Sequence, residues 1–282
     1  MDKKTTKVFG IFGDPVGHSL SPVIHNAAFQ SLHLPYYYVP FEISKERLKE
    51  AVLAMTPLGI AGINVTIPHK ETIIPFLDRL SDEAKKIGAV NTVERFNNEL
   101  IGHNTDGPGF LKSLEEADID LSGLRVILLG AGGAARGVAV SLLNANIAEL
   151  CLVARSIEKR KMLKNDLCAL FPNPKISEYP FDKNDFEPVP TLLINATSLG
   201  MKPDDPLPYR KERIDPVWAV ADLVYRPVKT PFLTAAEKAG AKIVPGVGML
   251  LHQAARSFEI FTKHKAPLET MKKALLTALN IP

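Results

Sequence analysis

LRVILLGAGGAARG, residues 124–137, is the stretch of sequence that decides the fold. Its first six residues are mostly apolar and predict a buried strand over 124–129, and the pattern after the glycines predicts a helix from about Ala134 to Asn144. The turn between them reads G-x-G-x-x-A. The first glycine permits a tight turn, the second lets the backbone approach a pyrophosphate, and free N–H groups at the helix start favour that anion.

An alternative interpretation of this turn is a plain strand-to-helix connection that binds no ligand. Three of the four residues from Gly130 to Gly133 are glycine, however, and ordering glycines costs more chain entropy than ordering other residues. Such a turn is favoured where a ligand must come close to the backbone. We therefore predict a dinucleotide at this turn.

The end of the following strand indicates which dinucleotide is bound. Sites for NAD usually place Asp or Glu there to hold the ribose 2′-hydroxyl, whereas Val153-Ala154-Arg155-Ser156 offers no acid. Arg155 and Lys159 offer positive charge instead, which favours the 2′-phosphate of NADP. The alternative is a solvated helix start, but cations in a first helical turn oppose the helix dipole.

Strand and helix patterns alternate on both sides of this unit. The chain has 282 residues, of which 46% are hydrophobic, and this length favours two domains. Extended runs before residue 108 alternate with helices that follow Ser21-Pro22 and Ser44, and this order favours a mostly parallel sheet. The predicted strands are 8–12, 36–41, 62–67, 90–96 and 100–104 in the first part and 124–129, 150–153, 192–195, 217–222 and 242–244 in the second, and further helices are predicted over 247–263 and 269–279.

Composition excludes several classes of protein. Lys and Arg exceed Asp and Glu by 34 to 31, giving a net charge of +3 without the basic stripe that nucleic-acid binding needs. Two cysteines, Cys151 and Cys168, are too few for a disulfide framework or a four-cysteine zinc site. The sequence shows neither a signal peptide nor a membrane span. We expect a cytoplasmic enzyme with a small-molecule substrate and no nucleic-acid or membrane partner.

A hairpin is predicted around Asn97-Asn98, because asparagine tolerates the positive φ angles of a two-residue turn. Pairing Phe96 with Glu99 sets Asn91 opposite Asn104. In that register Asn91 lies beside Asp106, although the two are far apart in sequence.

Lys70 is a candidate acid or base. It ends the run Asn64-Val65-Thr66-Ile67-Pro68-His69-Lys70, where Asn64 and Thr66 point to one face of a strand. Pro68 predicts a helix start, which would put Lys70 in the first turn, where the helix dipole lowers an ammonium pKa. The alternatives are an exposed surface lysine and, for its possible partner Asp106, a helix cap.

Ser19 and Ser21 precede or begin a helix that Pro22 starts, and Ser21 is predicted to cap it. A helix N-terminus with two hydroxyls is also suited to a carboxylate. His18, His25 and His69 have no metal-ligand spacing, so we interpret them as structural or surface residues and expect no metal.

Taken in order, these segments resemble the shikimate dehydrogenase family across residues 8–260. The motifs that carry the resemblance are His18-Ser19-Leu20-Ser21-Pro22, Asn64-Val65-Thr66-Ile67-Pro68-His69-Lys70, Gly88-Ala89-Val90-Asn91-Thr92, Asn104-Thr105-Asp106-Gly107, the glycine turn, Asn195-Ala196-Thr197-Ser198-Leu199-Gly200-Met201, Asp222-Leu223-Val224-Tyr225, and Gly248-Met249-Leu250 with Gln253. So many ordered motifs are far more specific than any one of them.

The resemblance implies an α/β fold of two domains: a mostly parallel α/β sandwich, residues 1–107 plus 245–282, that binds substrate and a Rossmann domain, residues 108–244, that binds NADP. It also implies NADP-linked interconversion of shikimate and 3-dehydroshikimate on the route to chorismate and the aromatic amino acids. Lys70 and Asp106 would be catalytic. The implied substrate residues are Ser19, Ser21, Asn64, Thr66, Asn91, Tyr225 and Gln253; the implied cofactor residues are Gly130, Ala131, Gly132, Gly133, Ala134, Ala154, Arg155, Ser156, Lys159, Thr197, Leu223 and Gly246.

One position departs from the family pattern, since many members have Asn where this chain has Ala154. One hydrogen bond to the adenosine ribose or its phosphate is then missing, which weakens NADP selectivity without changing its direction. Ser21 favours shikimate over quinate. The alternatives are a quinate or dual quinate/shikimate dehydrogenase and a metabolite-sensing protein without turnover, and the chain is expected to be a monomer or homodimer.

Overall fold

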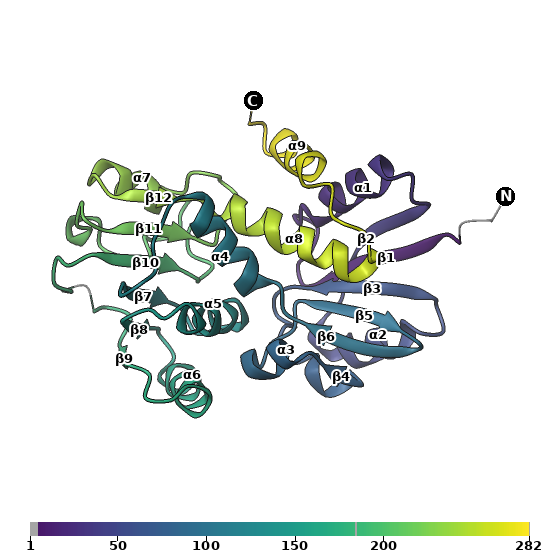
Figure 1. Ribbon diagram of the computed structural model, residues 1–282, viewed down its shortest axis with the longest axis horizontal. Helices are drawn as coiled ribbons and strands as arrows, with labels where there is room; N and C mark the ends of the chain where they lie inside the picture. Colours follow the sequence, from purple (N-terminus) through teal and green to yellow (C-terminus); the bar gives the residue numbers. More distant parts are fainter. Residues whose placement is uncertain (1–4, 184, 282) are drawn as a thin grey trace. The chain divides into compact units, whose positions relative to one another are not determined.

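The computed structural model describes residues 5–183 and 185–281. Its contacts divide the chain into two compact units, one formed by residues 1–105 with 253–282 and the other by residues 106–252. Each unit is built around one six-stranded sheet (Figure 1). The chain is therefore an α/β protein of two units, the first of which is discontinuous in sequence.

The sheet of the first unit is mixed, with strand order β2-β1-β3-β5-β6-β4. Its strands are β1 (Lys7–Gly13), β2 (Tyr36–Glu42), β3 (Ile60–Val65), β4 (Arg79–Leu80), β5 (Thr92–Phe96) and β6 (Glu99–His103). The pairs β1–β2, β1–β3 and β4–β6 are parallel, whereas β5 is antiparallel to both of its neighbours. The predicted hairpin is confirmed: Phe96 pairs with Glu99, and both Asn97 and Asn98 have positive φ, at 49° and 65°.

Helices of the first unit cover this sheet. They are α1 (Ser21–Ser31), α2 (Leu48–Ala54), α3 (Asp82–Ile87), α8 (Gly246–Thr262, of which residues from 253 belong to this unit) and α9 (Leu268–Ala278), with 3-10 turns at Lys45–Arg47 and Ile74–Phe76. Leu48, Val52 and Met55 are buried against Ile63 and Val65, as their helical spacing predicts.

An aromatic cluster forms a second part of this core. Phe29, Phe258 and Phe261 surround His25, whose ring stacks on Tyr38 with centroids 4.5 Å apart and planes 2° from parallel. Burial lowers the pKa of His25 to about 3, because a charged imidazole would lose its hydration. His25 is therefore a neutral core residue, in agreement with the interpretation from sequence.

The second unit is a doubly wound Rossmann sheet. Its six strands are all parallel in the order β12-β11-β10-β7-β8-β9. They are β7 (Arg125–Leu129), β8 (Glu149–Val153), β9 (Ile176–Tyr179), β10 (Thr191–Asn195), β11 (Ala219–Asp222) and β12 (Lys242–Val244); the helices are α4 (Asp106–Glu116), α5 (Gly133–Asn144), α6 (Ile157–Leu170) and α7 (Pro231–Lys238), with a 3-10 turn at Lys211–Arg213.

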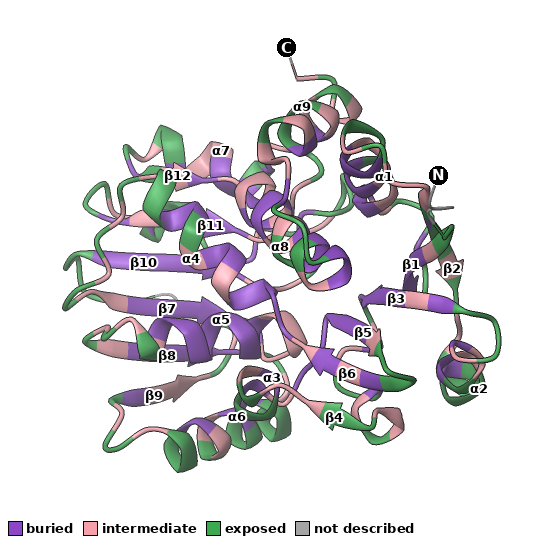
Figure 2. Ribbon diagram, turned by 45° about the vertical axis from the view of Figure 1, so that its right-hand side comes forward, coloured by how far each residue is buried: buried purple, intermediate pink, exposed green. Residues whose placement is uncertain are grey.

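Burial follows the position of each strand in this sheet. Every residue of β10 is buried, whereas the edge strand β9 is buried only at its first residue (Figure 2). Covered on both faces, central parallel strands read as nearly continuous apolar runs, which explains why 124–129 and 192–195 were recognisable in sequence.

The prediction of a helix that begins at Pro68 is wrong. Residues 67–73 form turns, and the only regular element between β3 and β4 is the 3-10 turn at Ile74–Phe76. The backbone carbonyls of Ile67 and Lys70 accept hydrogen bonds from Asp14 and Val90 instead, at 3.0 and 2.7 Å. These distant N–H groups occupy carbonyls that an α-helix would use for its own ladder.

The predicted cap of α1 is also corrected. Leu20, and not Ser21, occupies the N-cap of α1, because the Ile24 N–H donates to the Leu20 carbonyl and Ser21 is already helical. The divisions between the units fall at 105/106 and 252/253, whereas the sequence placed them at 107/108 and 244/245. The second division lies inside helix α8, where an uninterrupted helical pattern gives no boundary signal.

Candidate functional site

The glycine turn has the geometry that a bound pyrophosphate requires. Gly130 has a φ of +119°, and a Cβ there would lie 2.8 Å from the Ala196 carbonyl oxygen, so a side chain is excluded. Gly132 is the N-cap of α5, and a Cβ built on it would meet nothing within 4 Å. Open space therefore adjoins the helix start that Gly133 and Ala134 begin, where unpaired N–H groups attract an anion.

The segment after β8 carries the residues expected at the 2′-phosphate. Ser156 is the N-cap of α6 and accepts a hydrogen bond from the Lys159 N–H at 3.2 Å. Arg155 thus precedes the helix. The sequence-based prediction that both Arg155 and Lys159 lie in the first helical turn, against the helix dipole, therefore holds only for Lys159. The side chains of Arg155 and Lys159 are exposed, and the Arg155 guanidinium lies 6.0 Å from the ring centre of Phe181. Ala154 is buried, and its carbonyl oxygen accepts a hydrogen bond from the Arg160 guanidinium at 2.9 Å.

The remaining cofactor candidates lie at the carboxyl ends of neighbouring strands in the second unit. Thr197 follows β10, and Leu223 follows β11 and donates its N–H to the Asn195 carbonyl at 2.9 Å. Gly246 begins α8, with the backbone carbonyl of Asp222 2.8 Å from where its Cβ would be. Ligands of open parallel sheets bind at this carboxyl end, so the turn residues and these three share one edge.

In the first unit, the two serines lie at the start of α1. The Ser19 hydroxyl accepts the Ser21 N–H at 3.3 Å, one residue before the N-cap Leu20. Ser21 is buried and hydrogen-bonds the Tyr38 hydroxyl. Ser19 is only half-buried and remains open to a ligand.

Asn64 lies at the centre of a buried polar network in the first unit. Its Oδ1 accepts the Tyr38 hydroxyl at 2.7 Å, and its Nδ2 lies 3.0 Å from the Asn91 carbonyl, from Thr92 Oγ1 and from Ser257 Oγ. Both amide hydrogens of Asn64 are therefore used by protein acceptors. Only part of the Oδ1 acceptor capacity is left for a ligand.

The same network holds Asn91. Its Nδ2 donates to Thr105 Oγ1 at 2.9 Å, and its Oδ1 accepts the Thr105 N–H at 2.8 Å. Ser257 lies 3.1 Å from Thr105 Oγ1 and donates to the Gln253 carbonyl at 2.9 Å. Four predicted substrate residues, Ser21, Asn64, Asn91 and Gln253, are thus joined through four side chains that the prediction did not include: Tyr38, Thr92, Thr105 and Ser257.

The two predicted catalytic residues lie in segments that follow sheet strands. Lys70 is half-buried in the turns after β3, and its carbonyl accepts the Val90 N–H next to Asn91. Thr66, also half-buried, is the first residue after β3. Asp106 is the first residue of α4 in the second unit and is 4% exposed. Tyr225 is half-buried in the loop after β11.

Comparison with known proteins decides the family. A protein of Desulfitobacterium hafniense (strain Y51), a shikimate dehydrogenase (NADP(+)), is 42% identical over 276 residues, which are 98% of this chain and 99% of that protein. This chain belongs to the shikimate dehydrogenase family. The model of the shikimate dehydrogenase substrate binding domain matches residues 11–93, and that of the shikimate 5′-dehydrogenase C-terminal domain matches residues 246–276.

Solved structures agree with this assignment. Shikimate 5-dehydrogenase of Thermus thermophilus, in complex with NADP(H) and shikimate, is 35% identical with a TM-score of 0.86, covering 97% of this chain and 100% of that chain. Quinate dehydrogenase of Corynebacterium glutamicum, in complex with NAD, has the same TM-score of 0.86 at 26% identity, covering 97% and 100%. The family fold thus accommodates more than one substrate.

Of the four added network residues, Thr92 and Thr105 stand within the motifs quoted from the sequence, whereas Tyr38 and Ser257 gave a weak local signal. Tyr38 reads as one more aromatic in a strand, and Ser257 as a small residue in an apolar helix. Ser257 stands four positions after Gln253, the spacing of one helical face, which was the one available hint.

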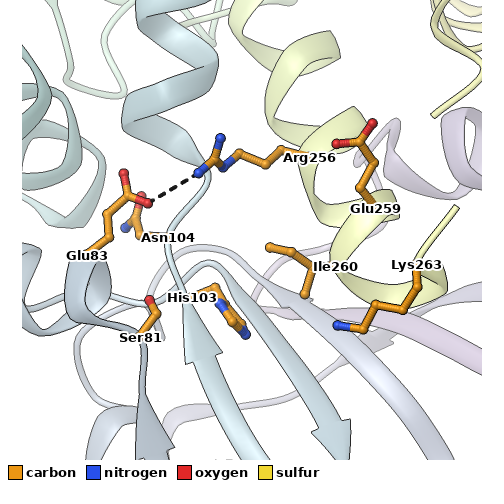
Figure 3. Close-up of a pocket in the computed structure, with 8 residues that line it drawn as sticks. All are labelled: Ser81, Glu83, His103, Asn104, Arg256, Glu259, Ile260 and Lys263. Carbon is orange, nitrogen blue, oxygen red and sulfur yellow. Dashed lines mark ion pairs between the residues drawn. The ribbon is translucent and has the colours of Figure 1, made fainter. Parts of the chain in front are cut away.

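A surface pocket of about 430 Å³ in the first unit is lined by none of the predicted site residues. Figure 3 shows Arg256 of α8 pointing toward Glu83; the lining also includes Glu259 and Ile260 of α8, Lys263 just after that helix, and Ser81, His103 and Asn104. Its charges are compensated within the unit, since Arg256 lies 3.7 Å from Glu83 and Lys263 lies 2.6 Å from Glu94. Nothing in its chemistry favours a cofactor.

The described part of the chain holds neither a membrane-spanning helix nor a metal cluster. Across residues 5–183 and 185–281, no helix combines the length and the apolar character needed to cross a bilayer. Within the same ranges, His, Cys, Asp and Glu side chains do not gather in groups of three or more that could hold a metal ion.

Proposed function

We propose that this chain catalyses the reversible NADP-linked interconversion of shikimate and 3-dehydroshikimate, the step that leads toward chorismate. The observation that carries the proposal is the full-length relationship to shikimate dehydrogenases, at 42% identity over 98% of the chain. The open glycine turn at the start of α5 fits a dinucleotide, and the buried network of the first unit holds Asn91 and Ser21 in place.

Lys70 is proposed as the acid and base of the reaction. Oxidation of a secondary alcohol removes a hydride from carbon and a proton from oxygen, and NADP, when bound, supplies the hydride acceptor. The neutral amine of Lys70 takes the hydroxyl proton, and its ammonium returns a proton when the ketone is reduced. Asp106 is proposed to accept a hydrogen bond from a neighbouring substrate hydroxyl and to orient the reacting groups.

Specificity for NADP rests on Arg155 and Lys159. Replacing Arg155 with alanine is expected to raise the KM for NADP by about 10-fold while changing the KM for NAD much less, because only NADP carries the phosphate that the guanidinium pairs with. Steady-state rates with both cofactors measure this. Lys161→Ala, at an exposed cation of α6, the helix that follows Arg155, is the matched control. Equal effects of Arg155→Ala on both cofactors would refute the role given to Arg155.

The substrate carboxylate is proposed to bind at the start of α1. Ser19→Ala is expected to weaken shikimate binding by about 1–3 kcal/mol, the cost of leaving a charged group short of a hydrogen bond. The KM for shikimate and its dissociation constant measure the change. Ser31→Ala, at the opposite end of α1, serves as the control. Wild-type KM and kcat in Ser19→Ala would place the carboxylate elsewhere.

Quinate dehydrogenase activity is the second candidate, because a quinate dehydrogenase shares this fold with a TM-score of 0.86. The test is reduction of NADP by shikimate with the purified full chain, with quinate and NAD as controls. Turnover of shikimate with NADP well above the other three combinations supports the proposal. Absence of turnover in every combination would favour a metabolite-sensing protein. A cytoplasmic monomer or homodimer is proposed as its working form.

A further inference from the structure

Two buried polar residues in the second unit have no role in the reaction as proposed. Asn195 ends β10 and Asp222 ends β11, and the two pair directly across these parallel strands. Their exposed fractions are 0% and 1%. They stand at the carboxyl edge of the sheet, the edge at which open parallel sheets bind ligands.

Asp222 accepts three hydrogen bonds. Its Oδ1 accepts from Asn195 Nδ2 at 2.8 Å and from the Val224 N–H at 3.0 Å, and its Oδ2 accepts from Thr230 Oγ1 at 2.7 Å. Thr230 in turn caps helix α7 by accepting the Leu233 N–H. The carboxylate therefore fixes the loop after β11 at both of its ends.

Asn195 performs the same task for the loop after β10. Its Oδ1 accepts from the Thr197 N–H at 3.1 Å and from Thr197 Oγ1 at 2.7 Å, and its Nδ2 also donates to the Leu199 carbonyl at 3.0 Å. A single side-chain pair thus holds residues 196–200 and 223–225 in register with each other.

Ionised Asp222 does not stabilise the fold through a charge partner. Among the described residues no Lys, Arg or His forms an ion pair with it, and its three donors are neutral. Burial raises its pKa to about 6, although the three hydrogen bonds act in the opposite direction. The folded-state pKa exceeds the unfolded value of 3.8. Folding stability therefore falls as pH rises between these two pKa values. An ionised Asp222 carboxylate lowers folding stability, which indicates that this side chain has a local role other than stabilising the fold.

We propose that Asn195 and Asp222 are positioning residues that set the two loops carrying Thr197 and Leu223, to which the family resemblance assigns cofactor binding, and Tyr225, to which it assigns substrate binding. This inference rests on the proposed function, since the three assigned roles hold only if the chain binds NADP and shikimate. Asn195 acts mainly on the cofactor loop, whereas Asp222 acts on both loops.

The two variants therefore have different expected effects. Asp222→Ala removes the shared acceptor and is expected to raise the KM values for NADP and for shikimate by about 10-fold or more each. Asn195→Ala is expected to weaken NADPH binding by about 10-fold and to change the KM for shikimate less. Asp222→Asn keeps the Oδ1 acceptor and is expected to recover most of the loss.

The experiment combines kinetics with two readouts that do not depend on turnover. NADPH affinity is measured by the change in its fluorescence on binding, and amide hydrogen exchange is measured over 196–200 and 223–225. Trp218, the single tryptophan and a core residue at the other end of the β11 segment, reports folding. Thr191→Val is the matched control: Thr191 is 1% exposed, lies at the opposite end of β10 and contacts neither loop, so it is expected to lower Tm and leave affinities unchanged.

The outcomes separate this inference from the proposed function. An inactive wild-type chain overturns the proposed function, whereas the exchange and NADPH measurements still test the positioning role. The inference is overturned if the wild type is active and Asp222→Ala folds, with unchanged hydrogen exchange in both loops and unchanged affinities for NADP and shikimate. If Asp222→Ala does not fold, Asn195→Ala decides: faster exchange over 196–200 with weaker NADPH binding supports the inference, and wild-type values overturn it.

Discussion

Replacing Lys70 with alanine is expected to lower kcat for shikimate oxidation by about 10²-fold or more, the usual yield of positioned acid–base catalysis. The hydroxyl proton must leave as the C–H bond breaks, and without the amine no side chain proposed here accepts it. NADPH affinity is expected to change little, since none of the proposed cofactor contacts involves Lys70. Steady-state kinetics in both directions and NADPH titration measure the two quantities.

Lys86→Ala is the control for this variant, because Lys86 is an exposed lysine of α3 in the same unit. It is expected to keep wild-type kcat. A Lys70→Ala variant that changes only KM would make Lys70 a binding residue, and another proton acceptor would have to be sought.

Replacing Asp106 with asparagine is expected to lower kcat by about 10²-fold as well, with the shape of the side chain kept and its charge lost. An amide can accept only through its oxygen, and its NH₂ group turns one acceptor position of the carboxylate into a donor. The orientation of the substrate hydroxyl is then weakened. Asp106 is 4% exposed at the start of α4, so the variant leaves the packing volume nearly unchanged.

Asp118→Asn, an exposed carboxylate shortly after the same helix, is the control and is expected to be neutral in kcat. The double variant Lys70→Ala/Asp106→Asn adds a second test. If the two residues act as a unit, the double variant loses little more than Lys70→Ala alone. Losses that multiply would show that Asp106 acts independently of Lys70.

Local rules explain what the sequence predicted correctly. The glycine turn is readable because Gly130 must adopt a φ of +119°, and the hairpin is readable because Asn97 and Asn98 tolerate positive φ. The central Rossmann strands are readable because burial on both faces demands apolar residues in an unbroken run. Each of these properties depends on residues within one short segment.

Long-range hydrogen bonds explain what the sequence could not predict. Pro68 carries a valid helix-start signal, but Asp14 and Val90 take the carbonyls of Ile67 and Lys70, and the segment forms turns. The network around Asn64 joins residues as far apart as 193 positions, since Ser257 reaches it from α8. No periodicity in sequence reports such a partner.

The sequence by itself determined the two α/β units, the dinucleotide turn and most of the residues proposed to act on substrate and cofactor. The tertiary structure alone decided how those residues are held: Asn64 and Asn91 by a buried network within the first unit, and Thr197 and Leu223 by Asn195 and Asp222 within the second. The physical reason is that a buried polar group must be paired, and its partner is set by which strands and helices pack together and not by neighbours in the chain.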